Sequence, residues 1–231
     1  MSPYQYGANN PIKYIDVNGD SLQVSFANDQ ARNAFIQVAN RGLEGQFEVN
    51  ISGEGIVTFQ ATEGGGDVSK LSKHGQAFYE ENNKILNAGG ITNLNVDYGR
   101  SDVHTGNLGA MTIDMADILQ FNENPSQLGG TQIGKLTHEI VEQGHAQGGR
   151  GSIIGDPYRA WQEHHPTAII AENNVNDSRR IDSRTLYGVQ DFARGGRTVR
   201  TLINTKKPGT WRTLWMSTNR NIISVTNRAL N

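Results

Sequence analysis

The chain contains no cysteine, and this absence excludes several kinds of functional site. Disulfides, thiolate zinc sites, cysteine nucleophiles and the cysteine-dependent zinc deaminases all require a thiol. Any zinc in this protein must therefore be held by histidine and carboxylate side chains.

Long apolar runs are also missing. No stretch approaches the roughly 20 apolar residues that a bilayer-spanning helix needs, and residues 1–20 lack the basic start and apolar centre of a signal peptide. We therefore predict no membrane span. With 231 residues, 27 glycines and only 6 prolines, the chain suits a soluble α+β protein with many turns.

Charge is distributed unevenly along the sequence. Residues 179–231 hold 11 Lys and Arg against two acidic residues, Asp182 and Asp191, so this basic C-terminal part carries a formal charge of +9. A basic segment favours contact with nucleic acid, an acidic membrane surface, an acidic partner or the acidic half of the same chain. The basic residues are scattered rather than clustered, which is more typical of a solvated surface.

Hydrophobic spacing predicts both strands and helices. The predicted strands lie around residues 22–26, 47–51, 56–58, 91–98 and 110–115, with a closing hairpin at 214–216 and 222–225. Asn28 is expected to cap a helix that ends at Gly42, and Asp67 is expected to cap a helix that reaches Leu86.

The most informative segment is LTHEIVE, which ends at Glu142. On a helix over residues 131–144, His138 and Glu142 lie four residues apart on one face, so both side chains can reach one ion. Glu139 is placed to take a proton from metal-activated water as a general base. Metallopeptidases use this arrangement in its His-Glu-x-x-His form, and here Glu142 replaces the second histidine.

A third ligand must come from another segment, since His145 lies too far along the helix from His138 to share its ion. We expect a second helix over residues 166–175, begun by Pro166, that presents His165 and Glu172. These two residues are also too far apart for both to ligate one ion in a regular helix. We favour His165 as the zinc ligand and keep Glu172 as the alternative, the other orienting a ligand or anchoring substrate.

The first twenty residues carry a family resemblance. The stretch SPYQYGANNPIKYIDVNGD closely resembles the end of the Rhs/YD-repeat core, with Val17 where that family has proline. In that family a variable C-terminal effector follows, often a toxin released by self-cleavage near this junction. The resemblance implies that residues 1–20 end a repeat core and that residues 21–231 form the effector.

A second resemblance covers about a quarter of the chain. The strand before the site, the His138-Glu139-x-x-Glu142 motif and the segment from His165 to Glu172 are similar to metallopeptidase-like toxin domains appended to Rhs cores. It implies an α+β, zincin-like fold, with a mixed or antiparallel sheet, an active-site helix and a second ligand-bearing helix. Tyr187 is a candidate donor to a developing oxyanion, although such a tyrosine more often packs in a core.

Together these observations predict a secreted or injected bacterial toxin that hydrolyses peptide bonds with Zn²⁺ and Glu139. The expected partners are a protein substrate and a cognate immunity protein, the latter implied by the Rhs-like leader. Two other functions stay open. One is a metal-dependent nuclease that contacts nucleic acid through residues 179–231, and the other is a non-catalytic effector with a degenerate metal site.

Overall fold

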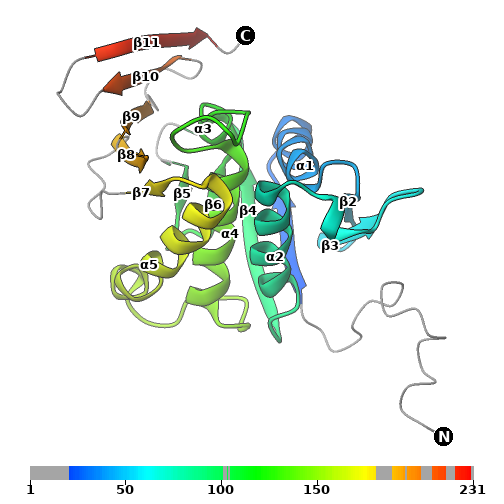
Figure 1. Cartoon of the computed structure of the whole chain (residues 1–231). Helices are drawn as coiled ribbons and strands as arrows, with labels where there is room; N and C mark the ends of the chain where they lie inside the picture. Colours follow the sequence, from blue (N-terminus) through cyan, green and yellow to red (C-terminus); the bar gives the residue numbers. More distant parts are fainter. Residues whose placement is uncertain are drawn as a thin grey trace, which may run out of the picture.

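The protein has an α+β fold built on two sheets (Figure 1). The computed structural model describes residues 21–100, 103, 105–180, 189–195, 197–203, 210–216 and 222–229. The Rhs-like leader at residues 1–20 and the candidate donor Tyr187 lie outside the described residues. None of the helices in the described part combines the length and the apolar character needed to cross a membrane.

The larger sheet is mixed. In spatial order its strands are β2 (Phe47–Ile51), β3 (Ile56–Ala61), β1 (Ser21–Phe26), β4 (Ile91–Asp97), β6 (Thr112–Asp114) and β5 (Gly106–Asn107). The central strands β1, β4 and β6 are parallel, whereas the pairs β2–β3, β3–β1 and β6–β5 are antiparallel. The predicted mixed sheet is confirmed, but the edge strand β5 was not predicted.

Five α-helices accompany this sheet within the described residues. They are α1 (Asp29–Leu43), α2 (Lys73–Leu86), α3 (Met115–Ile118), α4 (Gln132–Gln147) and α5 (Pro157–Asn176), with a short 3₁₀ helix, η2, at Val68–Lys70. Leu22 and Val24 of β1 are buried among apolar helix side chains, while the intervening Gln23 and Ser25 are not buried. This alternation is what a sheet covered on one face requires.

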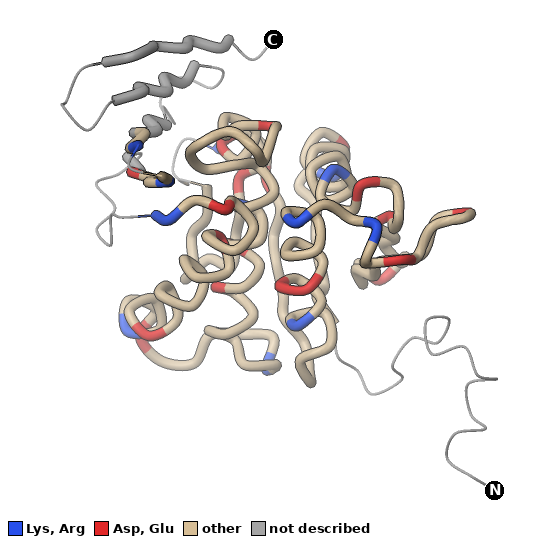
Figure 2. The backbone as a smooth tube through the Cα atoms, viewed as in Figure 1, with Lys and Arg blue, Asp and Glu red and all other residues tan. Residues whose placement is uncertain are grey.

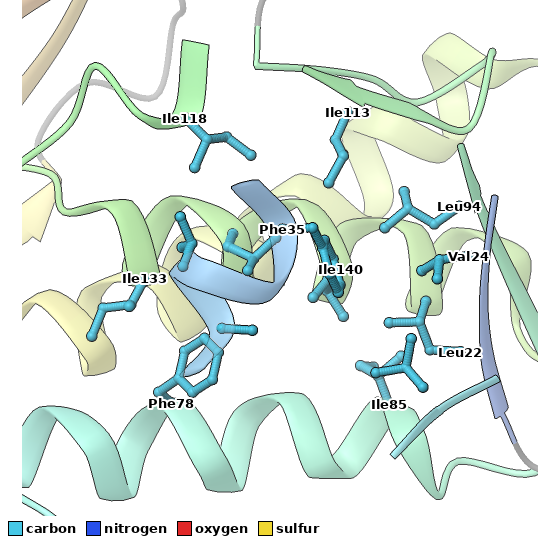
Figure 3. Close-up of a cluster of buried hydrophobic side chains, with 14 of the residues drawn as sticks. Leu22, Val24, Phe35, Phe78, Ile85, Leu94, Ile113, Ile118, Ile133 and Ile140 are labelled. Carbon is cyan, nitrogen blue, oxygen red and sulfur yellow. The ribbon is translucent and has the colours of Figure 1, made fainter. Parts of the chain in front are cut away.

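The hydrophobic core lies between the sheet and the helices (Figure 3). Phe35 of α1, Phe78 of α2 and Ile133 of α4 meet there, each with almost no exposed surface. Leu94 and Ile113 close the core from the sheet side. The apolar stripe of α4 therefore fixes which side of that helix turns away from the sheet.

Two predicted helix starts are corrected. Asp67 caps only η2, and Ser72 caps α2 by accepting a hydrogen bond from the Gly75 amide. The second site helix begins at Pro157 rather than Pro166, because Asp156 caps it and Pro157 occupies its first turn. Pro166 instead lies inside one continuous α5.

The smaller sheet is an antiparallel meander in the order β11-β10-β9-β8-β7. Its strands are β7 (Arg179–Arg180), β8 (Val189–Arg194), β9 (Arg197–Ile203), β10 (Thr210–Met216) and β11 (Ile222–Ala229). The predicted hairpin of the last two strands is confirmed. Phe192 of β8 is fully buried, and Gly130 lies against the rings of Phe192 and Phe121, so this sheet is anchored beside α4.

Candidate metal centre

The centre is built where α4 and α5 pack together. Contact between Gly134 and Asn176 at one end, and between Glu142 and His165 at the other, shows that the two helices run antiparallel. A Cβ on Gly134 would collide with the Asn176 amide, so glycine permits this close approach. The Thr131 hydroxyl caps α4 and also donates a 2.6 Å hydrogen bond to Asn176 Oδ1. The helix pair is therefore held at the end opposite His165.

His138, Glu142 and His165 form a buried group whose ligand atoms all lie within 4.8 Å of one another. His165 Nδ1 is 2.6 Å from Glu142 Oε1, and His138 Nε2 is 4.0 Å from the same oxygen. Two imidazoles and one carboxylate are a ligand set that suits zinc and leaves a fourth position for water. This group could hold a metal ion.

Glu172 lies behind His138 rather than within this group. Its Oε2 is 2.9 Å from His138 Nδ1, a contact with hydrogen-bond length but not hydrogen-bond alignment. His138 therefore faces Glu172 with one ring nitrogen and Glu142 with the other. A carboxylate on the outer nitrogen of a ligating histidine fixes the ring orientation and raises its basicity. Glu172 therefore contacts His138 from outside the group of His138, Glu142 and His165.

Burial and nearby charges set the protonation states of His138 and Glu172. It lowers the pKa of His138 to about 4, and the nearby Lys135 adds to this effect while Glu172 opposes it. Burial alone would raise the pKa of Glu172, but Lys135, His138 and Arg180 together hold it well below its usual range. At neutral pH the imidazole is therefore neutral and the carboxylate ionised, which are the forms that metal binding needs.

Glu139 is held by two neighbours that the motif does not reveal. Lys135, one turn earlier on α4, places Nζ 3.0 Å from Glu139 Oε1, and both side chains are almost fully buried. On the other side the carboxylate rests against Gly106 of the edge strand β5, where an added Cβ would collide with it. The general-base candidate is thus fixed between an ammonium group and a strand backbone.

The buried charged residues around the metal centre carry an excess of negative charge, which a bound cation would compensate. In the described part of the chain, three buried carboxylates, from Glu139, Glu142 and Glu172, face two buried cations, Lys135 and Arg180. A buried excess of negative charge is costly unless it is compensated. The buried Nε2 of His165 also has no hydrogen-bond partner among the described residues, and orphaned polar atoms are rare in native proteins. The residues present therefore fit a divalent ion.

Aromatic rings extend from the centre toward the surface along α5. The Trp161 ring lies 4.8 Å, centroid to centroid, from the His165 ring, and Tyr158 stacks on Trp161 at 5.8 Å. Tyr158 is 63% exposed, whereas His165 is buried. The outer boundary of the centre on this side is therefore aromatic.

Four residues predicted from the sequence lie close together in the structure, and three of their neighbours were not predicted. His138, Glu142, His165 and Glu172 converge as the helical spacing predicts, with Glu139 beside them. Lys135 could have been found, because it precedes Glu139 by four residues on the same helix. Gly106 and Arg180 carry no such signal, since only the tertiary fold brings them to the centre.

Comparison of the chain with protein-family models, curated proteins and solved structures finds no match.

Proposed function

We propose that the protein is a zinc-dependent hydrolase that cleaves peptide bonds. The observation that carries this proposal is the convergence of His138, Glu142 and His165 within 4.8 Å, with Glu139 next to them. Zinc at such a site supplies Lewis-acid activation of water and of a carbonyl group. The two histidines and Glu142 would hold it, and Glu172 would fix the orientation of the His138 ring.

Glu139 would act as the general base. Its Oε1 is paired with Lys135, which restrains the carboxylate, while its other oxygen lies toward β5. In this role Glu139 takes a proton from the attacking water and passes it to the leaving amine. Lys135 would hold the carboxylate at one position and offset part of its burial cost without leaving the site.

The edge strand β5 favours a polypeptide substrate. Gly106 lies at the outer side of the larger sheet and touches the Glu139 carboxylate. Extended peptides bind to sheet edges through main-chain hydrogen bonds. A peptide added along β5 would therefore run past Glu139. The resemblance to metallopeptidase-like toxin domains supports the same substrate class.

Elemental analysis of the purified chain is the first test. We expect about one zinc per wild-type chain and none in His138→Ala. A denatured protein substrate should then be cleaved by the zinc-loaded chain, and Glu139→Gln should lower this rate by about 100- to 10,000-fold with zinc retained. The exposed Glu163→Gln on α5 is the matched control and should cleave at the wild-type rate.

A metal-dependent nuclease is the second candidate, and the +9 formal charge of residues 179–231 favours it. Seven basic residues of this part lie on strands of the smaller sheet, namely Arg179, Arg180, Arg194, Arg197, Arg200, Arg212 and Arg228. Plasmid DNA incubated with the same preparations separates the two candidates. DNA cleavage that Glu139→Gln abolishes, without proteolysis, would reject the peptidase.

The Rhs-like leader supports a toxin delivered as part of a larger protein, with an immunity protein as its partner. Expression of residues 21–231 inside bacteria should then arrest growth, and Glu139→Gln should relieve the arrest. Growth arrest that persists in Glu139→Gln, in a chain that binds no zinc, would instead identify a non-catalytic effector.

A further inference from the structure

Arg180 contacts the metal centre from outside the two helices that build it. Its guanidinium Nη1 lies 3.4 Å from Glu172 Oε2, and both side chains are completely buried. His138 Nδ1 contacts the same oxygen at 2.9 Å. Oε2 of Glu172 therefore links Arg180 to the imidazole whose other nitrogen faces Glu142 and His165.

The backbone holds Arg180 in place by two further contacts. Its amide donates a 2.7 Å hydrogen bond to Asn173 Oδ1, so adjacent residues of α5 hold both the backbone and the side chain of Arg180. In β7 it also pairs with Phe192 of β8, whose ring is buried against Gly130. Arg180 is thus fixed to α5 by its guanidinium and its amide, and to the smaller sheet by its strand pairing.

Charge explains why Glu172 needs this partner. Lys135 is the other buried cation of the cluster, but its close contact, 3.0 Å, is with Glu139. Without Arg180, Oε2 of Glu172 would lose the guanidinium that contacts it beside His138 Nδ1, and the carboxylate would be free to turn toward Lys135. The His138 ring would then lose the carboxylate contact at Nδ1 that holds its orientation. Figure 2 shows the basic β7 next to the end of α5.

We propose that Arg180 is a positioning residue of the metal centre, which holds the His138 ring through Glu172 and so makes metal binding depend on the smaller sheet. This inference rests on the metal centre proposed above but not on the choice between peptidase and nuclease. An arginine suits the role because its guanidinium stays charged when buried and is less strongly hydrated than a lysine ammonium group.

Zinc affinity, measured by competition with a chromophoric chelator on the full chain, tests the inference. Arg180→Met should weaken zinc binding by about 10- to 100-fold, the usual effect of removing a residue that orients a ligand. Arg180→Lys should lose less, because it keeps the charge. The matched control is Arg179→Met, which removes the same charge from the same strand at an exposed position and should bind like wild type.

A double variant separates positioning from general destabilisation. If Arg180 acts through Glu172, Arg180→Met should cause little further loss of zinc affinity in a Glu172→Gln chain. The visible absorption spectrum of bound cobalt should also change in Arg180→Met and stay unchanged in Arg179→Met, because it reports ligand geometry rather than stability.

The outcomes are distinct. Wild-type zinc affinity in a folded Arg180→Met chain, or a full additional loss in the Glu172→Gln background, would overturn the inference alone. A wild-type chain that binds no zinc would overturn the metal centre and the inference with it. If Arg180→Met does not fold, Arg180→Gln replaces it, with circular dichroism confirming its fold. Weaker zinc binding is again the expected result, and wild-type affinity again overturns the inference.

Discussion

Helices α1 and α4 have nearly equal lengths, 15 and 16 residues, but they bury very different side chains. The seven buried residues of α1 are all apolar or glycine. Helix α4 buries 15 residues, and eight of these are polar or charged. Burying a polar group is costly unless it finds a partner, so α1 has the composition of a purely structural helix and α4 does not.

The buried polar residues of α4 fall into two groups. The first group, which is Gln132, Thr137, Gln143 and Gln147, bridges to neighbouring segments through hydrogen bonds with backbone groups or with Asn82, and these bonds explain their burial. Lys135, His138, Glu139 and Glu142 are instead engaged with one another and with α5. The structural contribution of α4 is therefore separable by mutation from its contribution to the metal centre.

The largest effect should come from removing a buried side chain of α1. Phe35→Ala removes a fully buried ring and should lower the free energy of unfolding by about 3–5 kcal/mol, measured by urea denaturation. Zinc affinity of the molecules that stay folded should be unchanged, since Phe35 lies outside the charged cluster. A loss of affinity in that folded fraction would contradict the separation of the two helices.

Zinc bound to the α4 residues should stabilise the folded protein against unfolding. At free zinc about 100-fold above its dissociation constant, the expected gain is about 3 kcal/mol, seen as a higher melting temperature that a chelator reverses. His138→Ala should show no such gain, whereas Phe35→Ala should keep it. A zinc-dependent shift of equal size in His138→Ala would place the ion elsewhere.

Gly106→Ala tests the support of Glu139 from the edge strand. The added methyl collides with the Glu139 carboxylate, and displacement of a catalytic group by about 1 Å typically costs 100-fold in rate. We expect this loss of hydrolysis with zinc affinity retained. Gly53→Ala, where a new Cβ meets nothing within 4 Å, is the control and should retain full activity.

The smallest effect for a single step in conditions, a change of one pH unit, concerns the acid stability of the metal-free chain. Burial lowers the pKa of His138 from 6.5 to about 4, so between these pH values the unfolded chain binds a proton that the folded chain excludes. The stability that the neutral His138 contributes above pH 6.5 is thus lost as the pH falls toward 4, by about 1.4 kcal/mol for each pH unit. Thermal melts with and without His138→Gln measure this slope.

Asp117 changes the stability with pH in the direction opposite to His138, so its effect is removed by mutation. Burial, helped by Asp114, raises the pKa of Asp117 from 3.8 to about 7. Asp117 makes its full contribution to the free energy of unfolding below pH 3.8, and this contribution is lost as the pH rises to 7. The His138 slope should therefore appear steeper in an Asp117→Asn background. An unchanged slope there would contradict the raised pKa of Asp117.

Local patterns predicted much of the larger sheet and of the centre. Alternation gave β1 and the β2–β3 hairpin, Asn28 marked the start of α1, and helical spacing placed His138 and Glu142 together. Each of these depends on residues close in sequence. The second site helix was placed too late because its first-turn proline is Pro157, and a proline inside a helix resembles a start.

The features that escaped prediction depend on contacts between distant segments. β5 has two residues, too few for any alternation, and exists because it pairs with β6. Gly106 reaches Glu139 only through that pairing. Arg180 reaches Glu172 through the turn after α5 and its pairing in β7. No spacing rule relates such residues before the fold is known.

The indole of Trp161 beside His165 gives the centre an intrinsic optical reporter. Cobalt and copper ions quench tryptophan fluorescence at short range, so occupancy of the centre can be titrated by emission alone, without any label or substrate. The other two tryptophans, Trp211 and Trp215, belong to β10, and Trp161→Phe therefore supplies the blank for such a titration.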